Sequence, residues 1–245
     1  MAITVDAPVC GEAVAPAFVD GEWHDLPEGW LDTANTASKF LSKVRVKANN
    51  PLGNTNHETF LHIRRNKMFA TNNENLIEFN IGRCSIQNTS LLASEVRLLK
   101  SFGNAPIAAC IADDRIRFRF PSGESCEFQN TGFEKKYLAV FKNYWDFNSE
   151  KSTSMPWKQA FLDRFEYLRD DDLIEVNPEG FIGSEGDNLF TVHLPAETCC
   201  PEKRVFTATS LYAAMSIADE VDFSQEHACY KNPTVRGIIV SRSIR

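Results

Sequence analysis

The chain has 245 residues, of which 43% are hydrophobic, and a formal net charge of −7. This length suits one large domain or two of ordinary size. No apolar run reaches the roughly 18 residues that a membrane-spanning helix needs, and the N-terminus lacks the basic region of a secretory leader, so we expect neither a membrane protein nor a secreted one. Seven cysteines, an odd number without C-x-x-C spacing, predict reduced thiols in a cytoplasm-like compartment and no zinc or other cofactor.

Residues 1–30 contain three prolines and little periodicity, which predicts an N-terminal arm or edge strand. A helix is expected to begin at Asp32 or Thr33 and to run to about Ala48, where Asn49, Asn50 and a proline follow. This segment carries four basic residues and no acidic residue between Thr33 and Ala48, the clearest charge anomaly in an acidic chain. The alternative is an ordinary solvated helix face. The basic residues are Lys39, Lys43, Arg45 and Lys47.

Two short strands and a polar turn follow, and then a third strand. The first two strands are predicted at Phe60–Ile63 and Lys67–Ala70, and the third at Leu76–Ile81 after the turn Thr71–Asn75. The same pattern returns in the second half of the chain. A repeat of this length indicates a duplicated domain. The second copy comprises Leu173–Val176, Phe181–Gly183, the turn Ser184–Asn188 and Leu189–Leu194.

A helix over Leu91–Phe102 is predicted next, with Arg97 and Lys100 on one side. The antiparallel meander expected after it has strands at Ile107–Ala112, Ile116–Phe120 and Glu124–Gln129. Residues 130–156 break this pattern. Within them, aromatic residues crowd Tyr137–Phe147, which predicts either a last strand that fills the core or a docking surface.

The second half repeats the order of the first. A helix over Trp157–Leu168 carries Lys158 and Arg164, and a helix over Ala208–Ala218 carries no basic residue. Three strands are expected after it, at Val221–Ser224, His227–Lys231 and Gly237–Arg242. Each half thus reads helix, three strands, helix, three strands. We predict an α+β fold with domains over 31–135 and 157–245, joined by a connector over 136–156.

This order of elements resembles the DNA sliding clamps, the ring-shaped processivity factors of replicative polymerases. The turn sequence from Ala70 to Leu76 is similar to the A-T-D-G-H-R-L-A turn of the bacterial clamp, although its histidine and arginine are missing. The stretch Ile238–Arg242 is similar to the i-i-V-x-R strand that ends many clamp domains. The resemblance implies two tandem clamp domains, each with antiparallel sheets outside and two helices on the inner face of a ring. Because clamp rings have about six domains, it also implies a homotrimer.

The resemblance further implies function and sites. A clamp encircles double-stranded DNA without sequence preference and tethers the polymerase, and it also binds a clamp loader, both through peptide motifs. Short length and sparse identity favour a phage or viral member that acts in the host cytoplasm. The implied DNA-binding residues are Lys39, Lys43, Arg45, Lys47, Arg97, Lys100, Lys158 and Arg164. The implied partner-binding residues are Asn73, Glu74, Asn75, Leu76, Tyr144, Trp145, Ile239, Val240 and Arg242.

Two other classes of function stay open at this point. An enzyme is disfavoured, because the five histidines show no paired-ligand spacing and no P-loop or nucleophile-elbow motif is present. A hydrolase with a cysteine–histidine pair that meets only in the fold remains an alternative. The other alternative is a non-enzymatic β-rich assembly or scaffold protein, virion or regulatory, that oligomerises without DNA.

Overall fold

A computed structural model of the chain describes residues 21–41, 60–72, 74–86, 88–112, 114–130, 132, 136–169, 172–184 and 191–242. The helices are α1 (Trp30–Ser38), α2 (Ala93–Ser101), α3 (Lys136–Tyr144), α4 (Lys158–Phe165) and α5 (Ala208–Ile217). The strands of the first half are β1 (Trp23–Asp25), β2 (Phe60–Arg64), β3 (Lys67–Thr71), β4 (Asn75–Asn80), β5 (Thr89–Leu92), β6 (Ala108–Ala112), β7 (Arg115–Arg119) and β8 (Ser125–Gln129). Those of the second half are β9 (Thr153–Ser154), β10 (Leu173–Asn177), β11 (Gly180–Ser184), β12 (Thr191–Pro195), β13 (Arg204–Thr207), β14 (Glu220–Asp222), β15 (His227–Lys231) and β16 (Val235–Val240).

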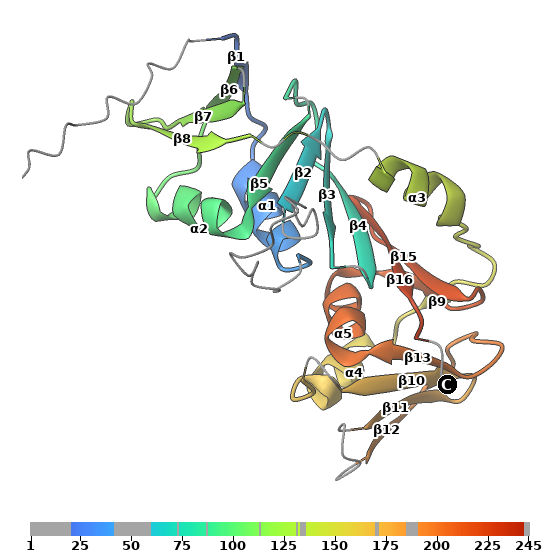
Figure 1. Ribbon diagram of the computed structural model, residues 1–245. Coiled ribbons are helices and arrows are strands. Elements are labelled where there is room, and N and C mark those ends of the chain that lie inside the picture. The colour runs from blue at the N-terminus through green and yellow to red at the C-terminus, as the bar shows by residue number, and fades with distance from the viewer. Residues whose placement is uncertain are drawn as a thin grey trace, which may run out of the picture.

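These strands form three antiparallel sheets (Figure 1). The two outer sheets have four strands each, in the orders β1-β6-β7-β8 and β12-β11-β10-β13. The central sheet has eight strands, in the order β5-β2-β3-β4-β16-β15-β14-β9. The central sheet therefore joins the two halves of the chain, and the joint is the pairing of β4 with β16.

The strand pairings repeat from one half to the other. In the first half β5-β2-β3-β4 form one unit and β1-β6-β7-β8 the other, and in the second half β13-β10-β11-β12 and β9-β14-β15-β16 form the same two units. Strand β12 therefore corresponds to β4, and β8 corresponds to β16. Within the chain β4 pairs with β16, whereas β8 and β12 each have only one neighbour among the described strands and lie at sheet edges.

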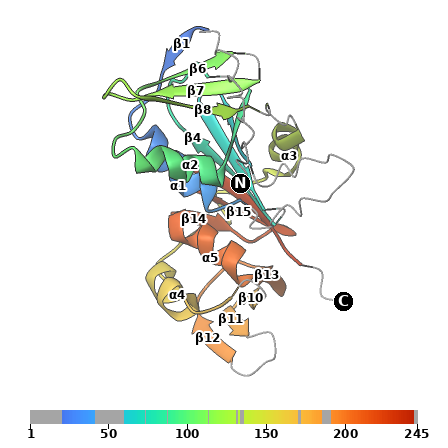
Figure 2. The same ribbon diagram turned by 60° about the vertical axis from the view of Figure 1, so that its left-hand side comes forward.

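Four helices and the connector helix cover opposite sides of the sheets. Helices α1, α2, α4 and α5 lie on one side, and α3 lies on the other side of the central sheet (Figures 1 and 2). Alternation along β4 explains this arrangement: Ile77 and Phe79 point into the main core under the four helices, and Leu76 points toward α3. The connector thus has its own small apolar cluster, separate from the main core.

Helix α1 is shorter than its sequence predicts, and it begins earlier. It starts at Trp30, whose buried ring packs 5.4 Å from the ring of Phe118, after Gly29 in a left-handed conformation with φ of 73°. It ends at Ser38, whose hydroxyl donates to the Asn35 carbonyl, and the next two amides bond three residues back, which closes the helix with tighter turns. The prediction of one basic helix reaching Ala48 is therefore wrong for its described part.

Two more local predictions are wrong. The aromatic stretch after residue 135 forms helix α3 and no strand, because Phe141 and Trp145, four residues apart, place their rings on one helix face over the central sheet. The residues before α2 and α5 form strands β5 and β13, which the sequence did not predict. Pairing with β2 and β10 satisfies their backbone groups.

Candidate partner-docking surface and DNA-facing helices

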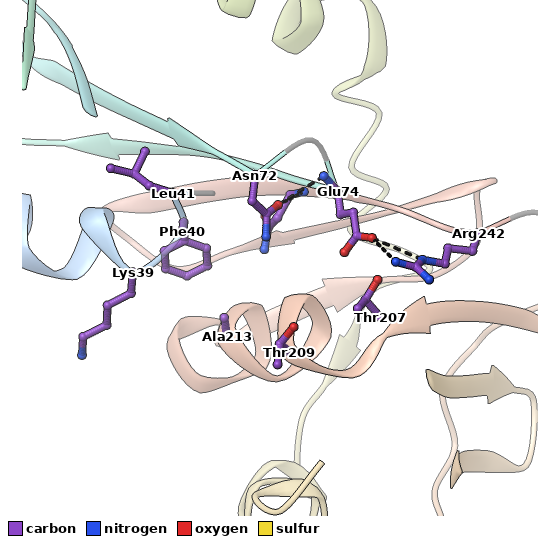
Figure 3. A pocket seen from close by; sticks show the side chains of 10 residues that line it. Lys39, Phe40, Leu41, Asn72, Glu74, Thr207, Thr209, Ala213 and Arg242 are labelled. Carbon is purple, nitrogen blue, oxygen red and sulfur yellow. Dashed lines mark hydrogen bonds and ion pairs between the residues drawn. The ribbon is translucent and has the colours of Figure 1, made fainter. Parts of the chain in front are cut away.

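The β3–β4 turn and the end of β16 meet at the joint between the halves. Asn75 pairs with Ile239, and the amide of Val240 donates a 2.8 Å hydrogen bond to the carbonyl of Glu74. Arg242 follows β16, and its guanidinium lies 2.6 Å from Oε1 of Glu74 (Figure 3). Two segments expected to border a partner pocket, the turn and the C-terminal strand, are therefore in direct contact.

Glu74 also connects this turn to helix α5. The hydroxyl of Ser210, in the first turn of α5, donates a 2.9 Å hydrogen bond to Oε2 of Glu74. Burial by itself raises the pKa of Glu74, but the neighbouring Thr207 hydroxyl and the hydrogen bonds from Arg242 and Ser210 outweigh it and lower the pKa below its usual value. Glu74 is thus held as a carboxylate near a helix N-terminus, where the helix dipole favours negative charge.

A cleft of about 540 Å³ lies beside this network, between the end of α1, the β3–β4 turn and the start of α5. Its lining is mixed: Phe40 and Ala213 are apolar, and Asn72, Thr209 and Arg242 are polar. In Figure 3 the side chain of Lys39 extends away from the Glu74–Arg242 pair. The cleft thus offers both apolar surface and hydrogen-bonding groups, as surfaces that contact a partner do.

The opposite face of the same joint is covered by the connector. Phe141 is buried against Phe69, Leu76, Cys229 and Ile238, which come from four neighbouring strands. The rings of Trp145 and Phe147 stack with centroids 5.8 Å apart. The guanidinium of Arg236 lies 4.9 Å from the Phe141 ring and the amino group of Lys231 lies 4.2 Å from the Phe147 ring. The aromatic residues of the connector therefore pack against the strands of the joint from a helix, whereas the sequence suggested such packing only from a last strand.

Next to this cover, a small apolar patch stays exposed. Tyr144 is 55% exposed and Val240 is 53% exposed. His227 lies between them, because it pairs with Val240 across β15 and β16 and meets the Tyr144 ring edge-on at 6.1 Å. A backbone hydrogen bond from Val240 to Glu74 links this patch, Tyr144–His227–Val240, to the Glu74–Arg242 pair at the end of the β4–β16 joint. The apolar patch thus has a charged pair at its rim, as protein-docking sites usually do.

The structure distributes the predicted partner-binding residues over three environments. Tyr144 and Val240 are in the exposed patch and Glu74 and Arg242 are at its rim, whereas Trp145 and Leu76 belong to the connector cluster. Asn75 and Ile239 are buried and support the surface from below. Asn73 lies outside the described residues.

The predicted DNA-binding residues differ in whether their charged groups are exposed to solvent or hydrogen-bonded within the chain. Arg97 and Lys100 are exposed on α2, and Lys39 is exposed just after α1. In contrast, the amino group of Lys158 donates to the carbonyl of Ala218 at the end of α5, and Arg164 donates to the carbonyl of His193. Lys43, Arg45 and Lys47 lie outside the described residues.

Sequence reasoning missed the polar contacts that cross the joint. The hydroxyl of Tyr230 reaches Asn75, and Arg236 forms two hydrogen bonds with Glu78. The sequence does contain one sign that Tyr230 packs closely against β16, which is Gly237. A Cβ at this position would lie 2.1 Å from the Tyr230 ring. The signal is readable only when the pairing of β15 with β16 is known.

Two further findings concern the described residues. None of their helices is long and apolar enough to cross a membrane. They also contain no group of three or more histidine, cysteine or acidic side chains placed to hold a metal ion.

The sequence matches no protein-family model and no curated protein sequence. Among solved structures, the Helicobacter pylori β clamp bound to a DNA ligase peptide has a TM-score of 0.67 at 7% identity, over 95% of this chain and 69% of that one. A Caulobacter crescentus polymerase III β structure has a TM-score of 0.65 at 12% identity, over 94% and 69%. A putative polymerase III β subunit from Eubacterium rectale has a TM-score of 0.65 at 9% identity, over 94% and 68%. The chain therefore has the fold of the DNA sliding clamps.

Proposed function

We propose that the chain is a DNA sliding clamp, a ring that encircles duplex DNA and tethers a polymerase to it without any catalysis of its own. Two clamp domains per chain and six per ring give a homotrimer. The likeness to bacterial clamps supports this function, and so does the placement of four helices on one side of the sheets. The low identity to the bacterial clamps, 7–12%, supports a phage or viral member working in the host cytoplasm.

One observation supports the assembly of separate copies into a ring. The strand pairing that joins the two halves, β4 with β16, uses strands whose counterparts β12 and β8 lie at sheet edges among the described strands. Free antiparallel edges readily pair with another chain. If β12 of one copy pairs with β8 of the next as β4 pairs with β16, every copy gains one neighbour on each side. Such head-to-tail contacts close into a ring when the rotation between copies allows it.

The internal repeat also predicts the register of this pairing. Val192 pairs with Gly183 on β11, and Ile77 pairs with Ala70 on the corresponding strand β3, so Val192 corresponds to Ile77. In the same way Cys126 pairs with Phe118 on β7, and Gly237 pairs with Tyr230 on β15, so Cys126 corresponds to Gly237. Because Ile77 lies opposite Gly237 within the chain, Val192 should lie opposite Cys126 of the next copy.

The repeat also predicts whether Val192 and Cys126 form a hydrogen-bonded or a non-hydrogen-bonded pair of the antiparallel ladder. Hydrogen bonds of 2.8 Å join Val240 to Glu74 and Asn80 to Thr234, so these are the hydrogen-bonded pairs of the β4–β16 ladder. Ile77 and Gly237 then form a pair of the other type, in which Cα atoms are about 4.5 Å apart. This separation falls within the range that a disulfide can bridge.

The test of the ring is a crosslink between copies. Val192→Cys should form a disulfide with the native Cys126 of its neighbour and give covalent oligomers up to a closed ring. Because burial raises the pKa of the Cys126 thiol to about 11, the reaction needs an added oxidant and alkaline pH. His193→Cys is the matched control, since its side chain lies on the other face of β12 and should not crosslink. Val192→Cys with Cys126→Ser should not crosslink either.

The clamp function is tested by measuring retention on circular DNA and stimulation of a polymerase. A loaded ring should stay on a closed circular duplex and leave once the duplex is cut, and it should lengthen the products of a polymerase it serves. A crosslinked oligomer that never retains circular DNA would support the scaffold alternative. A chain that is monomeric with and without DNA, and does not crosslink, would contradict the clamp.

The docking surface for partners is proposed at the Tyr144–His227–Val240 patch and the Glu74–Arg242 rim. The Helicobacter pylori clamp binds a DNA ligase peptide, which supports a short peptide as the ligand here. We expect the polymerase and the clamp loader to reach this patch through such peptides. Arg97, Lys100 and Lys39 are proposed as the main DNA contacts, since they are exposed on the helical side. Unlike Lys158 and Arg164, they make no side-chain hydrogen bond to another residue that the structure describes.

A further inference from the structure

A second cleft lies at the other end of strands β3 and β4 from Glu74. It has a volume of about 700 Å³ and lies between the β2–β3 turn and the segment that follows β4. Lys67 pairs with Asn80 at this end, whereas Thr71 pairs with Leu76 beside the Glu74 turn. The strands span about 14 Å between these pairs, so the cleft is well separated from the Glu74–Arg242 pair. The residues that line the cleft are Arg65, Asn66, Asn80, Gly82, Arg83, Cys84 and Ser85.

Backbone hydrogen bonds fix the walls of this cleft. The amide of Arg65 donates a 2.8 Å hydrogen bond to the carbonyl of Ile86, and the amide of Ile81 donates a 2.9 Å hydrogen bond to the carbonyl of Asn66. The side chain of Cys84 is buried in the main core and anchors the segment after β4. The cleft is therefore formed before any ligand arrives, which lowers the free-energy cost of binding.

Arg65 occupies a backbone position that suits glycine. The pairing of Arg64 with Lys67 leaves Arg65 and Asn66 as a two-residue hairpin loop. Arg65 has a φ of 55°, in the left-handed region, and Asn66 does not share this conformation. Glycine is the preferred residue at the first position of such a loop. A longer side chain there strains the backbone, and strain of this kind is found mostly at functional sites. The arginine side chain therefore has a use other than forming the turn.

The cleft is positively charged in an acidic chain. Its lining includes the exposed side chains of Arg65 and Arg83 and no carboxylate. Neither arginine forms an ion pair within the described part of the chain, whereas two cations of the neighbouring strands are bonded to Glu78. Each guanidinium can hold an oxyanion through two parallel hydrogen bonds, and the Asn66 amide and the Ser85 hydroxyl are further donors. This set of donors suits a ligand with carboxylate or phosphate groups.

The surroundings favour the carboxylates of a protein over the phosphates of DNA. The lining contains no aromatic side chain on which a base could stack. The side toward helix α1 is acidic, because a Cβ on Gly82 would lie 4.0 Å from Pro27, and Glu28 and Asp32 are exposed just after this proline. A duplex that follows the helices would bring its phosphates against these carboxylates, which repel them. A protein segment can reach the arginines from the side away from α1.

We propose that this cleft, the arginine cleft, docks an acidic segment of a protein partner. Aspartate or glutamate carboxylates of the partner bond to the guanidinium groups of Arg65 and Arg83. Because the patch around Val240 lies beside Glu74, at the far end of β3 and β4, one chain has room for two partners at once. This simultaneous use rests on the proposed clamp function, whereas the binding of the acidic segment does not.

The binding is tested with the full-length chain and a fluorescently labelled hexaglutamate peptide, by fluorescence anisotropy at low salt. The parent chain should bind this peptide although both carry a net negative charge. Arg65→Gln with Arg83→Gln should weaken binding at least roughly tenfold, since one charge-assisted hydrogen bond contributes about a factor of ten. Lys142→Gln with Lys151→Gln is the matched control, because it removes the same charge from two exposed residues elsewhere and should leave the dissociation constant unchanged.

Two further variants separate the geometry and the fold from the charge. Arg65→Lys with Arg83→Lys keeps the charge but loses the planar guanidinium groups, so it should bind more weakly than the parent chain and more tightly than the glutamine pair. Arg65→Gly should also weaken peptide binding, while its thermal unfolding temperature should equal or exceed that of the parent chain, because glycine suits the left-handed position. Weaker binding in a chain that is no less stable is not due to misfolding.

The outcomes decide which ligand the arginine cleft takes. Peptide affinity that is unchanged in Arg65→Gln with Arg83→Gln would overturn the proposal, and so would an equal loss in the control pair. A labelled duplex or single-stranded oligonucleotide that binds through the same arginines more tightly than the peptide would also overturn it, because the ligand would then be nucleic acid. None of these results affects retention on circular DNA. If the chain instead forms no ring, peptide binding by the single chain still tests the arginine cleft.

Discussion

The hydroxyl of Tyr230 donates a 2.8 Å hydrogen bond to Oδ1 of Asn75, across the joint between the two halves of the chain. Both side chains are buried, and the amide of Asn75 continues the contact to the carbonyl of Ser210 in α5. Burial raises the pKa of Tyr230 well above its usual value, so the group remains a neutral donor. Asn75, at the start of β4, therefore joins the first half of the chain to β15 and α5 of the second half.

Replacing Tyr230 by phenylalanine should weaken this joint. The change keeps the ring but leaves a buried amide oxygen without a partner, which costs about 1–3 kcal/mol in the free energy of unfolding. Urea unfolding of the purified chain measures it. Tyr167→Phe is the control, since Tyr167 is 80% exposed and its loss should change little. Equal stability of Tyr230→Phe and the parent chain would show that the bond contributes nothing.

Glu74 makes the same joint sensitive to acid. Its pKa is lowered in the folded chain, below the usual 4.5, so its contribution is complete above that pH and is lost as the pH falls through the folded-state pKa. The difference in unfolding free energy between the parent chain and Glu74→Gln should thus be greatest near neutral pH and shrink below about pH 4.5. Glu226→Gln, at an exposed turn position, should show no such trend. A difference that stays constant with pH would contradict the role of the charge.

Much of the fold could be predicted from the sequence, and the misses have physical causes. Strands such as Arg115–Arg119 alternate polar and apolar residues, so they are recognisable from the chain alone. Strands β5 and β13 are not, because four residues before a helix look like a cap until their partners β2 and β10 are known. Helix α1 ends at Ser38, before the residue at which the basic stripe predicts its end, and the hydroxyls of Thr36 and Ser38 bond to carbonyls of its own turns.

The site was predictable in its segments but not in its contacts. Similarity to the clamps placed the turn and the last strand in the same pocket, and Glu74 and Arg242 do meet. The sequence could not reveal which neighbours on a strand face outward. Ile239 and Val240 are adjacent, yet one is buried and the other is 53% exposed, because the register with β4 decides the face.

The DNA contacts can be tested by removing charge without reversing it. Arg97→Gln with Lys100→Gln should weaken retention on DNA, and each lost phosphate contact should reduce the slope of log K against log salt concentration by about 0.9. Lys142→Gln is the matched control, since Lys142 is exposed on α3, across the central sheet from α2. Arg164→Gln should have a smaller effect, because the guanidinium is already bonded to the His193 carbonyl. An effect of Lys142→Gln as large as that of the α2 pair would place the DNA elsewhere.

A substitution at one exposed residue can test partner docking separately from ring assembly. Val240→Glu puts a charge at the centre of the Tyr144–His227–Val240 patch, close to Glu74, where an apolar peptide side chain could no longer bury its surface. With a polymerase that the parent chain stimulates, the variant should lose most of the increase in product length on a primed circular template. Ring mass and retention on circular DNA should not change. Thr234→Glu, at the other end of β16 and also exposed, should keep the stimulation. If both variants stimulate the polymerase fully, the partner docks on a different surface, and if Val240→Glu also loses its ring, the residue acts through assembly and not through docking.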